Sequence, residues 1–172
     1  MFHCRGKAGR VHEVEVEDPR VARVIRRCED LPGQDLFQYV GEDGEPVDVT
    51  SDNVNDYIRE AAGEEFTAKD FRTWTGTVLA AWTLDELAGA EAPPKKQLVA
   101  AIESVARELG NTPAVCRACY VHPDVIDAHL DGTLKDGLGR KAMEKLTQER
   151  HRLSPQEAAV LAFLERRLAE AG

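Results

Sequence analysis

The residues with the clearest chemical potential are a tyrosine and two cations that lie far apart along the chain. Lys69 and Arg72 stand three positions apart, so a helix would place both on one face. An arginine can hold two phosphate oxygens at once and keeps its charge at neutral pH. A tyrosine hydroxyl is a poor nucleophile, because its ordinary pKa is about 10, unless cations activate the phosphate. Tyr120 beside such cations could carry out covalent phosphoryl transfer, whereas taken alone Tyr120 would be a structural tyrosine and Arg72 a helix-surface arginine paired with an acidic neighbour such as Asp70.

A fourth candidate, Asn111, follows Gly110 and precedes a predicted helix. Its side-chain amide could donate a hydrogen bond to a phosphate oxygen, and the nearby helix N–H groups favour anions. The Gly-Asn pair is also a common way to end the preceding helix. The two roles are compatible, and both stay open at this point.

Cys116 and Cys119 form a Cys-x-x-Cys pair, and His122 could extend it to three metal ligands. A structural zinc site needs about four ligands, and the sequence holds no second Cys-x-x-Cys pair. Free cysteines pack as small apolar residues, so we expect two buried thiols on a helix face. The sequence therefore predicts no metal and no cofactor. His122 also lies near Tyr120, but a role as general base is the weaker alternative.

The elements expected to position these residues are mostly helices. Proline and cap residues open them and glycines end them. We expect a β-hairpin over 2–16 and a short strand over 36–40; helices are expected over 19–28, 51–62, 68–87, 95–109, 113–120, 123–131 and 155–171. The fold class is mainly α (α+β) with a small β-hairpin at the front. Expected apolar faces include Val21, Val24, Ile25 and Cys28 in the first helix, and Ala158, Leu161, Leu164 and Leu168 in the last; Phe71 and Trp74 are expected to anchor the core.

Charge is unevenly distributed over a chain whose net charge is −9. Residues 13–65 carry 16 acidic and 5 basic side chains, whereas residues 66–122 carry six of each sign. A local cationic pocket can therefore exist on an acidic protein, although the overall charge does not favour tight nonspecific DNA binding. No apolar run reaches the roughly 20 residues of a membrane helix, and the first residues lack a signal core. We expect no membrane partner and a cytoplasmic, nucleoid-associated location.

Three segments resemble the catalytic domain of bacterial and poxvirus-like type IB DNA topoisomerases. They are Thr67-Ala-Lys-Asp-Phe-Arg-Thr-Trp74, Leu31-Pro-Gly-Gln-Asp-Leu-Phe-Gln-Tyr39 and the tyrosine segment Gly-Asn-Thr-Pro…Cys-Arg-x-x-Tyr-Val-His-Pro, which ends at Pro123. The resemblance implies a helical domain of the topoisomerase and tyrosine recombinase type over 1–132. Residues 133–172 would form a helical extension packed on it.

The resemblance also implies roles for the candidate residues. Tyr120 would attack a phosphodiester of duplex DNA, leaving a 3′-phosphotyrosyl bond and a free 5′-hydroxyl. Arg72, Lys69 and Asn111 would bind the phosphate, and Lys7, in a Gly-Lys hairpin turn, would donate a proton to the departing 5′ oxygen. The strand swivels, supercoils relax, and the hydroxyl reseals the nick without ATP, metal or nucleotide. Related recombinases tend to have histidine where Lys69 stands, so lysine favours the topoisomerase.

One catalytic feature of the family has no match in this sequence. The family carries another arginine in a Leu-Arg-x-x-His-like segment, and Arg5, Arg10 and Arg20 lack these surroundings. We expect the chain to be truncated at its N-terminus, without this segment and without the DNA-clamping domain that precedes it. The alternatives are a catalytically impaired remnant that only binds DNA, a tyrosine recombinase relative, and a helical interaction module without nucleic acid.

Overall fold

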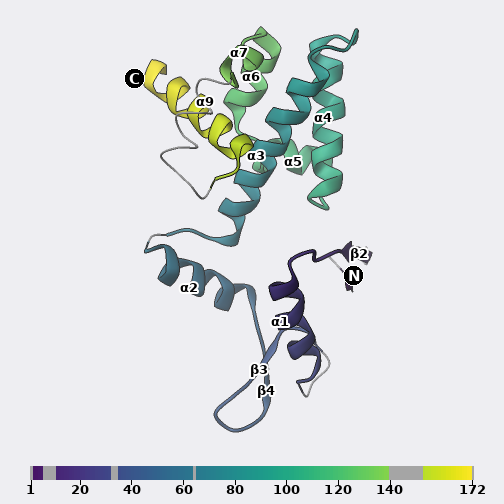
Figure 1. The fold of residues 1–172 in the computed structure, drawn as a ribbon, viewed down its shortest axis with the longest axis vertical. Helices are drawn as coiled ribbons and strands as arrows, with labels where there is room; N and C mark the ends of the chain where they lie inside the picture. The colour runs from purple at the N-terminus through teal and green to yellow at the C-terminus, as the bar shows by residue number, and fades with distance from the viewer. Residues whose placement is uncertain (1, 6–10, 32–34, 64, 140–152, 172) are drawn as a thin grey trace. The chain divides into compact units, whose positions relative to one another are not determined.

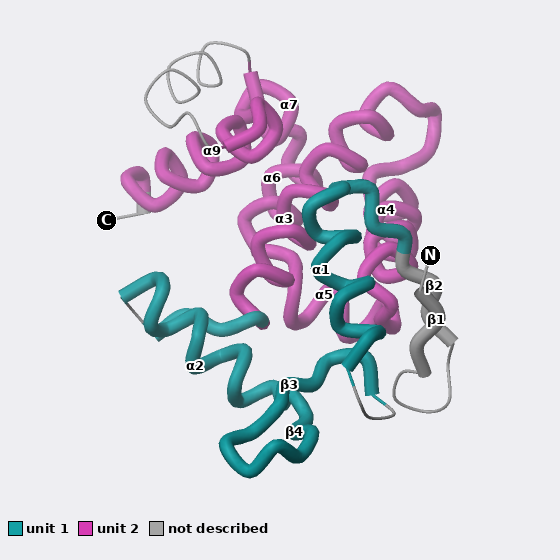
Figure 2. The backbone as a smooth tube through the Cα atoms, turned by 60° about the horizontal axis from the view of Figure 1, so that its bottom comes forward, with its two compact units in different colours: residues 1–68 teal, residues 69–172 magenta. Residues whose placement is uncertain are grey.

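The computed structural model describes residues 2–5, 11–31, 35–63, 65–139 and 153–171 of the 172-residue chain (Figure 1). The chain forms two compact units, residues 1–68 and 69–172, which Figure 2 distinguishes by colour. Its described part is mainly helical with two small antiparallel hairpins, so the predicted fold class is confirmed. The boundary expected between 132 and 133 stays a prediction.

The first unit contains short elements joined by turns. Strands β1 (Phe2–Arg5) and β2 (Val11–Val14) pair antiparallel, as expected, with Phe2 opposite Val14. Helix α1 (Pro19–Glu29) opens at Asp18, whose carboxylate accepts the Arg20 backbone N–H at 2.7 Å. A second hairpin pairs β3 (Gln38–Val40) with β4 (Pro46–Asp48) around Gly44, which has a φ of 84°. The strand β4 was not predicted.

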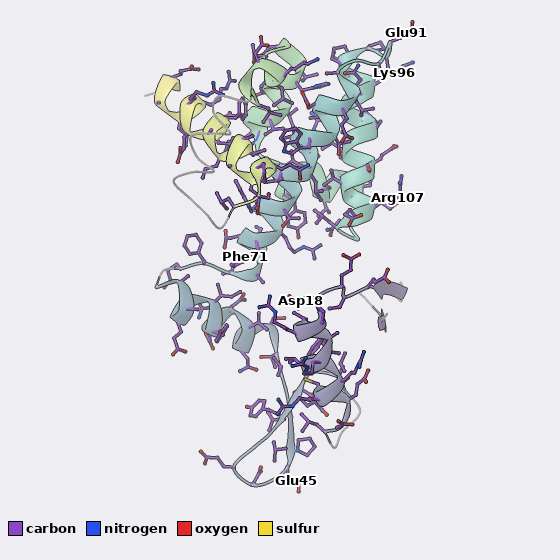
Figure 3. All side chains as sticks on the ribbon, in the orientation of Figure 1. Asp18, Glu45, Phe71, Glu91, Lys96 and Arg107 are labelled. Carbon is purple, nitrogen blue, oxygen red and sulfur yellow. The ribbon has the colours of Figure 1, made fainter. Side chains whose placement is uncertain are left out.

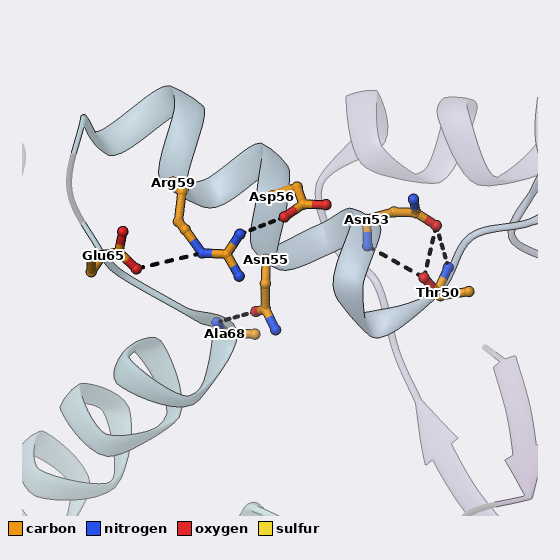
Figure 4. A network of polar contacts seen from close by, with 7 residues as sticks. All are labelled: Thr50, Asn53, Asn55, Asp56, Arg59, Glu65 and Ala68. Atoms are coloured by element: carbon orange, nitrogen blue, oxygen red, sulfur yellow. Dashed lines mark hydrogen bonds and ion pairs between the residues drawn. The ribbon is translucent and has the colours of Figure 1, made fainter.

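Helix α2 (Ser51–Ala62) shows how local side chains fix its ends (Figure 4). Thr50 and Asn53 form a reciprocal capping box, and Gly63 ends the helix in a left-handed conformation. Arg59 pairs with Asp56 and with Glu65. The Asn55 side chain accepts the Ala68 backbone N–H at 3.0 Å, which ties α2 to the residue that begins the next helix.

The first unit buries little apolar surface. Among its described residues, Ile25 is buried at 7% exposure, while Val21 and Val24 are 47% and 58% exposed. The expected apolar face of α1 is therefore covered at Ile25 but largely exposed at both valines. A hydrophobic pattern identifies the apolar side of a helix but does not say how much of that side other elements cover.

The second unit is a helical bundle built around α3 (Ala68–Leu87). Figures 1 and 2 show α3 in the middle of this unit, with α4 on one side and α9 on the other. The other helices among the described residues of this unit are α4 (Pro94–Glu108), α5 (Pro113–Cys119), α6 (Pro123–Asp131), α7 (Leu134–Gly137) and α9 (Pro155–Ala171). Each of these helices begins within two residues of its predicted start, except α7, which was not predicted.

The core of the second unit joins all of its helices. Its fully buried residues include Ala80, Ala81 and Leu84 of α3, Ala101 of α4, Cys116 of α5, Val125 and Ala128 of α6, and Ala159 and Val160 of α9. Helix α9 docks through its first turn, where the indole N–H groups of Trp74 and Trp82 donate to the Glu157 carboxylate and the Gln156 carbonyl.

Two expectations about this core need correction. The predicted stripe of α9 is only partly correct: Ala158 is buried and Leu164 packs against the core, but Leu168 is 65% exposed, and Ala159, Val160 and Phe163 are buried as well. Phe71, expected in the core, is 60% exposed at the beginning of α3 (Figure 3). Trp74 does pack against the core as expected. The first turn of α3 extends beyond the other described helices of this unit, which leaves Phe71 exposed (Figure 1).

Candidate active site

Helix α3 carries the two predicted cations on its first turns. Lys69 and Arg72 are both exposed, so an anion in solvent can approach either side chain. The helix continues without interruption from these residues into the buried segment around Ala80. Both cations therefore stand near the N-terminal end of a helix whose C-terminal half is anchored in the core.

The end of α4 places Asn111. Gly110 adopts a φ of 67°, and the Asn111 backbone N–H donates to the Ala106 carbonyl at 2.7 Å. This is the hydrogen bond of a Schellman motif. Asn111 therefore takes part in helix termination, which was one of the two roles expected for it. That bond uses the backbone N–H, while the side-chain amide donates separately to the Leu109 carbonyl at 3.1 Å.

Helix α5 presents Tyr120 at its end. The Thr112 hydroxyl accepts the Val115 backbone N–H at 3.3 Å, and Pro113 occupies the first turn, as the sequence predicted. Tyr120 is the C-cap residue, and its backbone N–H donates to the Cys116 carbonyl at 3.0 Å. The side chain is half-buried.

Three of the predicted residues meet at one place. The guanidinium carbon of Arg72 lies 5.3 Å from the centre of the Tyr120 ring, within the range of a cation–π contact. Arg72 Nη2 donates to the Leu109 carbonyl at 2.6 Å, and Asn111 Nδ2 donates to the same oxygen at 3.1 Å. Arg72 and Asn111 thus both donate to the Leu109 carbonyl, and the Tyr120 ring lies next to the Arg72 guanidinium.

Sequence reasoning missed the residues of α3 that contact the tyrosine segment. A Cβ atom placed on Gly76 would lie 2.5 Å from the Tyr120 carbonyl oxygen, so the two backbones touch. The Thr77 hydroxyl donates to the Tyr120 carbonyl at 3.4 Å and accepts the His122 backbone N–H at 3.1 Å. The glycine inside an otherwise helical pattern was the one available signal, since such a glycine often marks a close approach.

The two lysines are less constrained. Lys69 precedes Arg72 by about one helical turn, and its carbonyl accepts the Thr73 hydroxyl at 3.0 Å. Lys7 lies outside the described residues, in the connection between β1 and β2. The roles of both lysines in binding or protonating a phosphate group stay predictions.

The cysteines and His122 do not form a metal site in the described part of the chain, where no three potential ligands cluster. Cys116 is fully buried, and burial raises the pKa of its thiol. Cys119 is exposed, so the expectation of two buried thiols is wrong for this residue. His122 caps α6, because its Nδ1 accepts the Asp124 backbone N–H at 3.2 Å.

A search of the described residues finds no helix with the length and hydrophobicity needed to cross a membrane.

Two comparisons bear on what this arrangement of residues does. Residues 2–132 match the family described as eukaryotic DNA topoisomerase I, catalytic core. The chain is also 32% identical over 129 residues to a DNA topoisomerase 1B of Acanthamoeba polyphaga mimivirus. That similarity covers 70% of this chain but only 38% of the viral protein, so the chain spans well under half the length of this relative. The matched region contains all five predicted site residues.

Proposed function

Because this chain belongs to the family of type IB DNA topoisomerases, we propose that it cleaves and rejoins one strand of duplex DNA through a covalent bond to Tyr120. The observation that carries the proposal is the position of the Arg72 guanidinium, 5.3 Å from the ring centre of Tyr120. A phosphate bound by that guanidinium would lie beside the phenolic hydroxyl.

The phosphate is held mainly by Arg72 and Asn111. A guanidinium carries several N–H donors, so the bond to the Leu109 carbonyl leaves others for nonbridging oxygens. Asn111 holds its side-chain N–H at the same carbonyl, and a small rotation would turn it toward the phosphate. Lys69 adds a second positive charge from the same helix. Catalysis of phosphoryl transfer rests largely on such positioning and charge neutralisation.

The reaction exchanges one ester for another. The Tyr120 hydroxyl loses its proton to solvent and its oxygen bonds to phosphorus, while the bond from phosphorus to the 5′ oxygen breaks. Lys7 donates a proton to that oxygen, which leaves as a 5′-hydroxyl. The broken strand swivels about the intact one, and the 5′-hydroxyl then attacks the phosphotyrosyl bond and releases Tyr120. The bond energy is conserved, so the cycle consumes no ATP and uses side chains as its cations.

An arginine-rich face on α1 supports DNA as the partner despite the acidic balance of the chain. A helix places residues at spacings of three, four and seven on one side, and α1 carries three exposed basic residues at such spacings, Arg20, Arg23 and Arg27, with a fourth, Arg26, next to them. Arg20 pairs with Asp18, and its side chain is still 88% exposed. The other three have no ion pair among the described residues. Such a face can bind backbone phosphates by releasing counterions.

A second candidate function is DNA binding without cleavage. It is favoured by the exposed arginines of α1, which can bind backbone phosphates without taking part in any cleavage step.

The test is covalent trapping on a duplex with a nick placed so that the cleaved piece diffuses away. We expect the wild-type chain to form a DNA adduct that resists denaturation, and Tyr120→Phe to form none while binding the duplex equally well. Salt-sensitive binding without an adduct would establish the second candidate instead. If neither an adduct nor binding is observed, the proposed function is wrong.

A further inference from the structure

We infer that a row of three α3 residues, Thr73, Gly76 and Thr77, positions the backbone of Tyr120 for attack and so controls the rate of cleavage rather than the affinity for DNA. These residues stand at spacings of three and four, so they share one face of α3. The inference rests on the proposed function, because it gives a purpose to contacts around the proposed nucleophile.

The row reaches the tyrosine segment on both sides of the nucleophile. The Thr73 hydroxyl lies 3.3 Å from the Cys119 carbonyl, which precedes Tyr120. The Thr77 hydroxyl contacts the Tyr120 carbonyl at 3.4 Å and the His122 backbone N–H at 3.1 Å. Thr77 is only 2% exposed, so its hydroxyl sits where water does not compete for these groups.

These backbone groups need partners from another element. Cys119 and Tyr120 stand at the end of α5, where carbonyls have no partner within the helix. His122 is the N-cap of α6, so its N–H lies outside that helix as well. Tyr120 joins the two helices in a nonhelical conformation, with φ of −127° and ψ of −4°. The Thr77 hydroxyl supplies partners to the Tyr120 carbonyl and the His122 N–H. The single hydroxyl proton of Thr73 is shared between the Cys119 carbonyl at 3.3 Å and the Lys69 carbonyl at 3.0 Å, so Thr73 adds a weaker contact to the junction.

Gly76 lets the contact form. Its ideal Cβ would lie 2.5 Å from the Tyr120 carbonyl oxygen and 3.1 Å from the Tyr120 Cβ. Any side chain there would push the junction away from α3 and lengthen both threonine contacts. Glycine is unfavourable inside a helix, and this close approach is a physical reason for its presence.

The consequence for catalysis comes from Arg72, which stands four residues before Gly76 on the same helix. One rigid element therefore carries the phosphate-binding guanidinium and holds the backbone of the nucleophile. Their separation is set inside α3 and does not depend on how the rest of the protein moves. A displacement of about 1 Å between reacting groups can cost about a hundredfold in rate, so a small change in the row is expected to act on cleavage.

The experiment compares Thr77→Val, which keeps the shape but removes the hydroxyl, with Thr77→Ser, which keeps the hydroxyl. Gly76→Ala provides a second way to disturb the junction. The matched control is Val160→Ala, which creates a cavity in the same core from a different helix, α9. Each variant is measured for its melting temperature, its affinity for duplex DNA and its single-turnover rate of adduct formation below the melting temperature.

We expect Thr77→Val and Gly76→Ala to form the adduct at least about tenfold more slowly with DNA affinity within about twofold of wild type. Thr77→Ser should stay within about threefold of wild type, and Val160→Ala should lower the melting temperature without a comparable change in rate. The inference fails if Thr77→Val cleaves at the wild-type rate, if serine does not rescue it, or if Val160→Ala slows cleavage equally. If the wild type itself forms no adduct, the proposed function fails instead.

Discussion

The guanidinium of Arg72 and the phenol ring of Tyr120 face one another at 5.3 Å, although α4 and α5 intervene between them in the sequence. Arg72 also donates to the carbonyl of Leu109, which ends α4 and receives the Asn111 amide. Arg72 and Asn111, which come from two separate sequence segments, thus donate to the same carbonyl oxygen. Arg72 and Asn111 are therefore the first two residues to substitute.

Arg72→Ala and Arg72→Lys should each slow adduct formation by about 10²–10³-fold, because a lysine cannot hold two phosphate oxygens in the fixed geometry of a guanidinium. The melting temperature should fall by about 2–4 °C, since an exposed cation–π contact contributes about 0.5–1 kcal/mol, and each variant should stay folded at the assay temperature. The control is Arg107→Ala, which removes an exposed arginine of α4 and should leave the rate unchanged (Figure 3). Wild-type cleavage by Arg72→Ala would remove Arg72 from the mechanism.

Asn111→Ala should slow adduct formation by about tenfold, in line with the loss of about one hydrogen bond of 1–1.5 kcal/mol in the transition state. The Schellman bond uses the backbone N–H of residue 111, so helix termination survives the substitution. Asn111→His, which restores a side-chain N–H donor, should recover part of the rate. Equal rates for alanine and wild type in a single-turnover assay would show that Asn111 serves only to end α4.

Arg23→Ala combined with Arg27→Ala should weaken duplex binding and reduce the slope of log affinity against log salt concentration by about 1–2, because each phosphate contact contributes about 0.9. Lys95→Ala with Lys96→Ala removes the same charge from exposed positions in α4. Fluorescence anisotropy at several salt concentrations measures the affinity of both double variants and so distinguishes their salt dependence. If both pairs reduce binding equally, overall charge and not the arginine face of α1 is responsible.

Glu157 should make the docking of α9 sensitive to acid. Hydrogen bonds from the Ser154 backbone N–H and hydroxyl, and then from the Trp74 indole, lower the pKa of its carboxyl below the usual 4.5. A lowered folded-state pKa means that the ionised carboxylate stabilises the fold above pH 4.5 and that this stabilisation is lost as the pH falls through the lower, folded-state value.

Glu157→Gln should therefore lower the melting temperature near neutral pH by about 2–4 °C, the effect of losing about 1 kcal/mol of capping energy. The difference from wild type should shrink as the pH falls well below 4.5. Glu170→Gln, at an exposed position near the other end of α9, is the control for removing one charge. A difference that persists unchanged in acid would mean that the carboxylate charge does not contribute.

The sequence by itself determined the helices and the residue types of the site. Thr50, Thr112 and Ser154 open helices, and Gly63, Gly110 and Gly132 end them with positive φ. These choices depend on hydrogen bonds and torsion angles within a few residues, so local sequence suffices to predict them. The same applies to Arg72, Asn111 and Tyr120, whose chemistry belongs to their own side chains.

Only the tertiary structure decided which surfaces meet. Phe71 is exposed and Ala159 is buried because coverage depends on where neighbouring helices begin and end, which no periodicity records. The shared Leu109 carbonyl and the close approach of Gly76 to Tyr120 likewise join residues that are distant in sequence. Such contacts arise from close packing of whole elements, in which the missing Cβ atom of Gly76 allows the backbone of Tyr120 to touch α3.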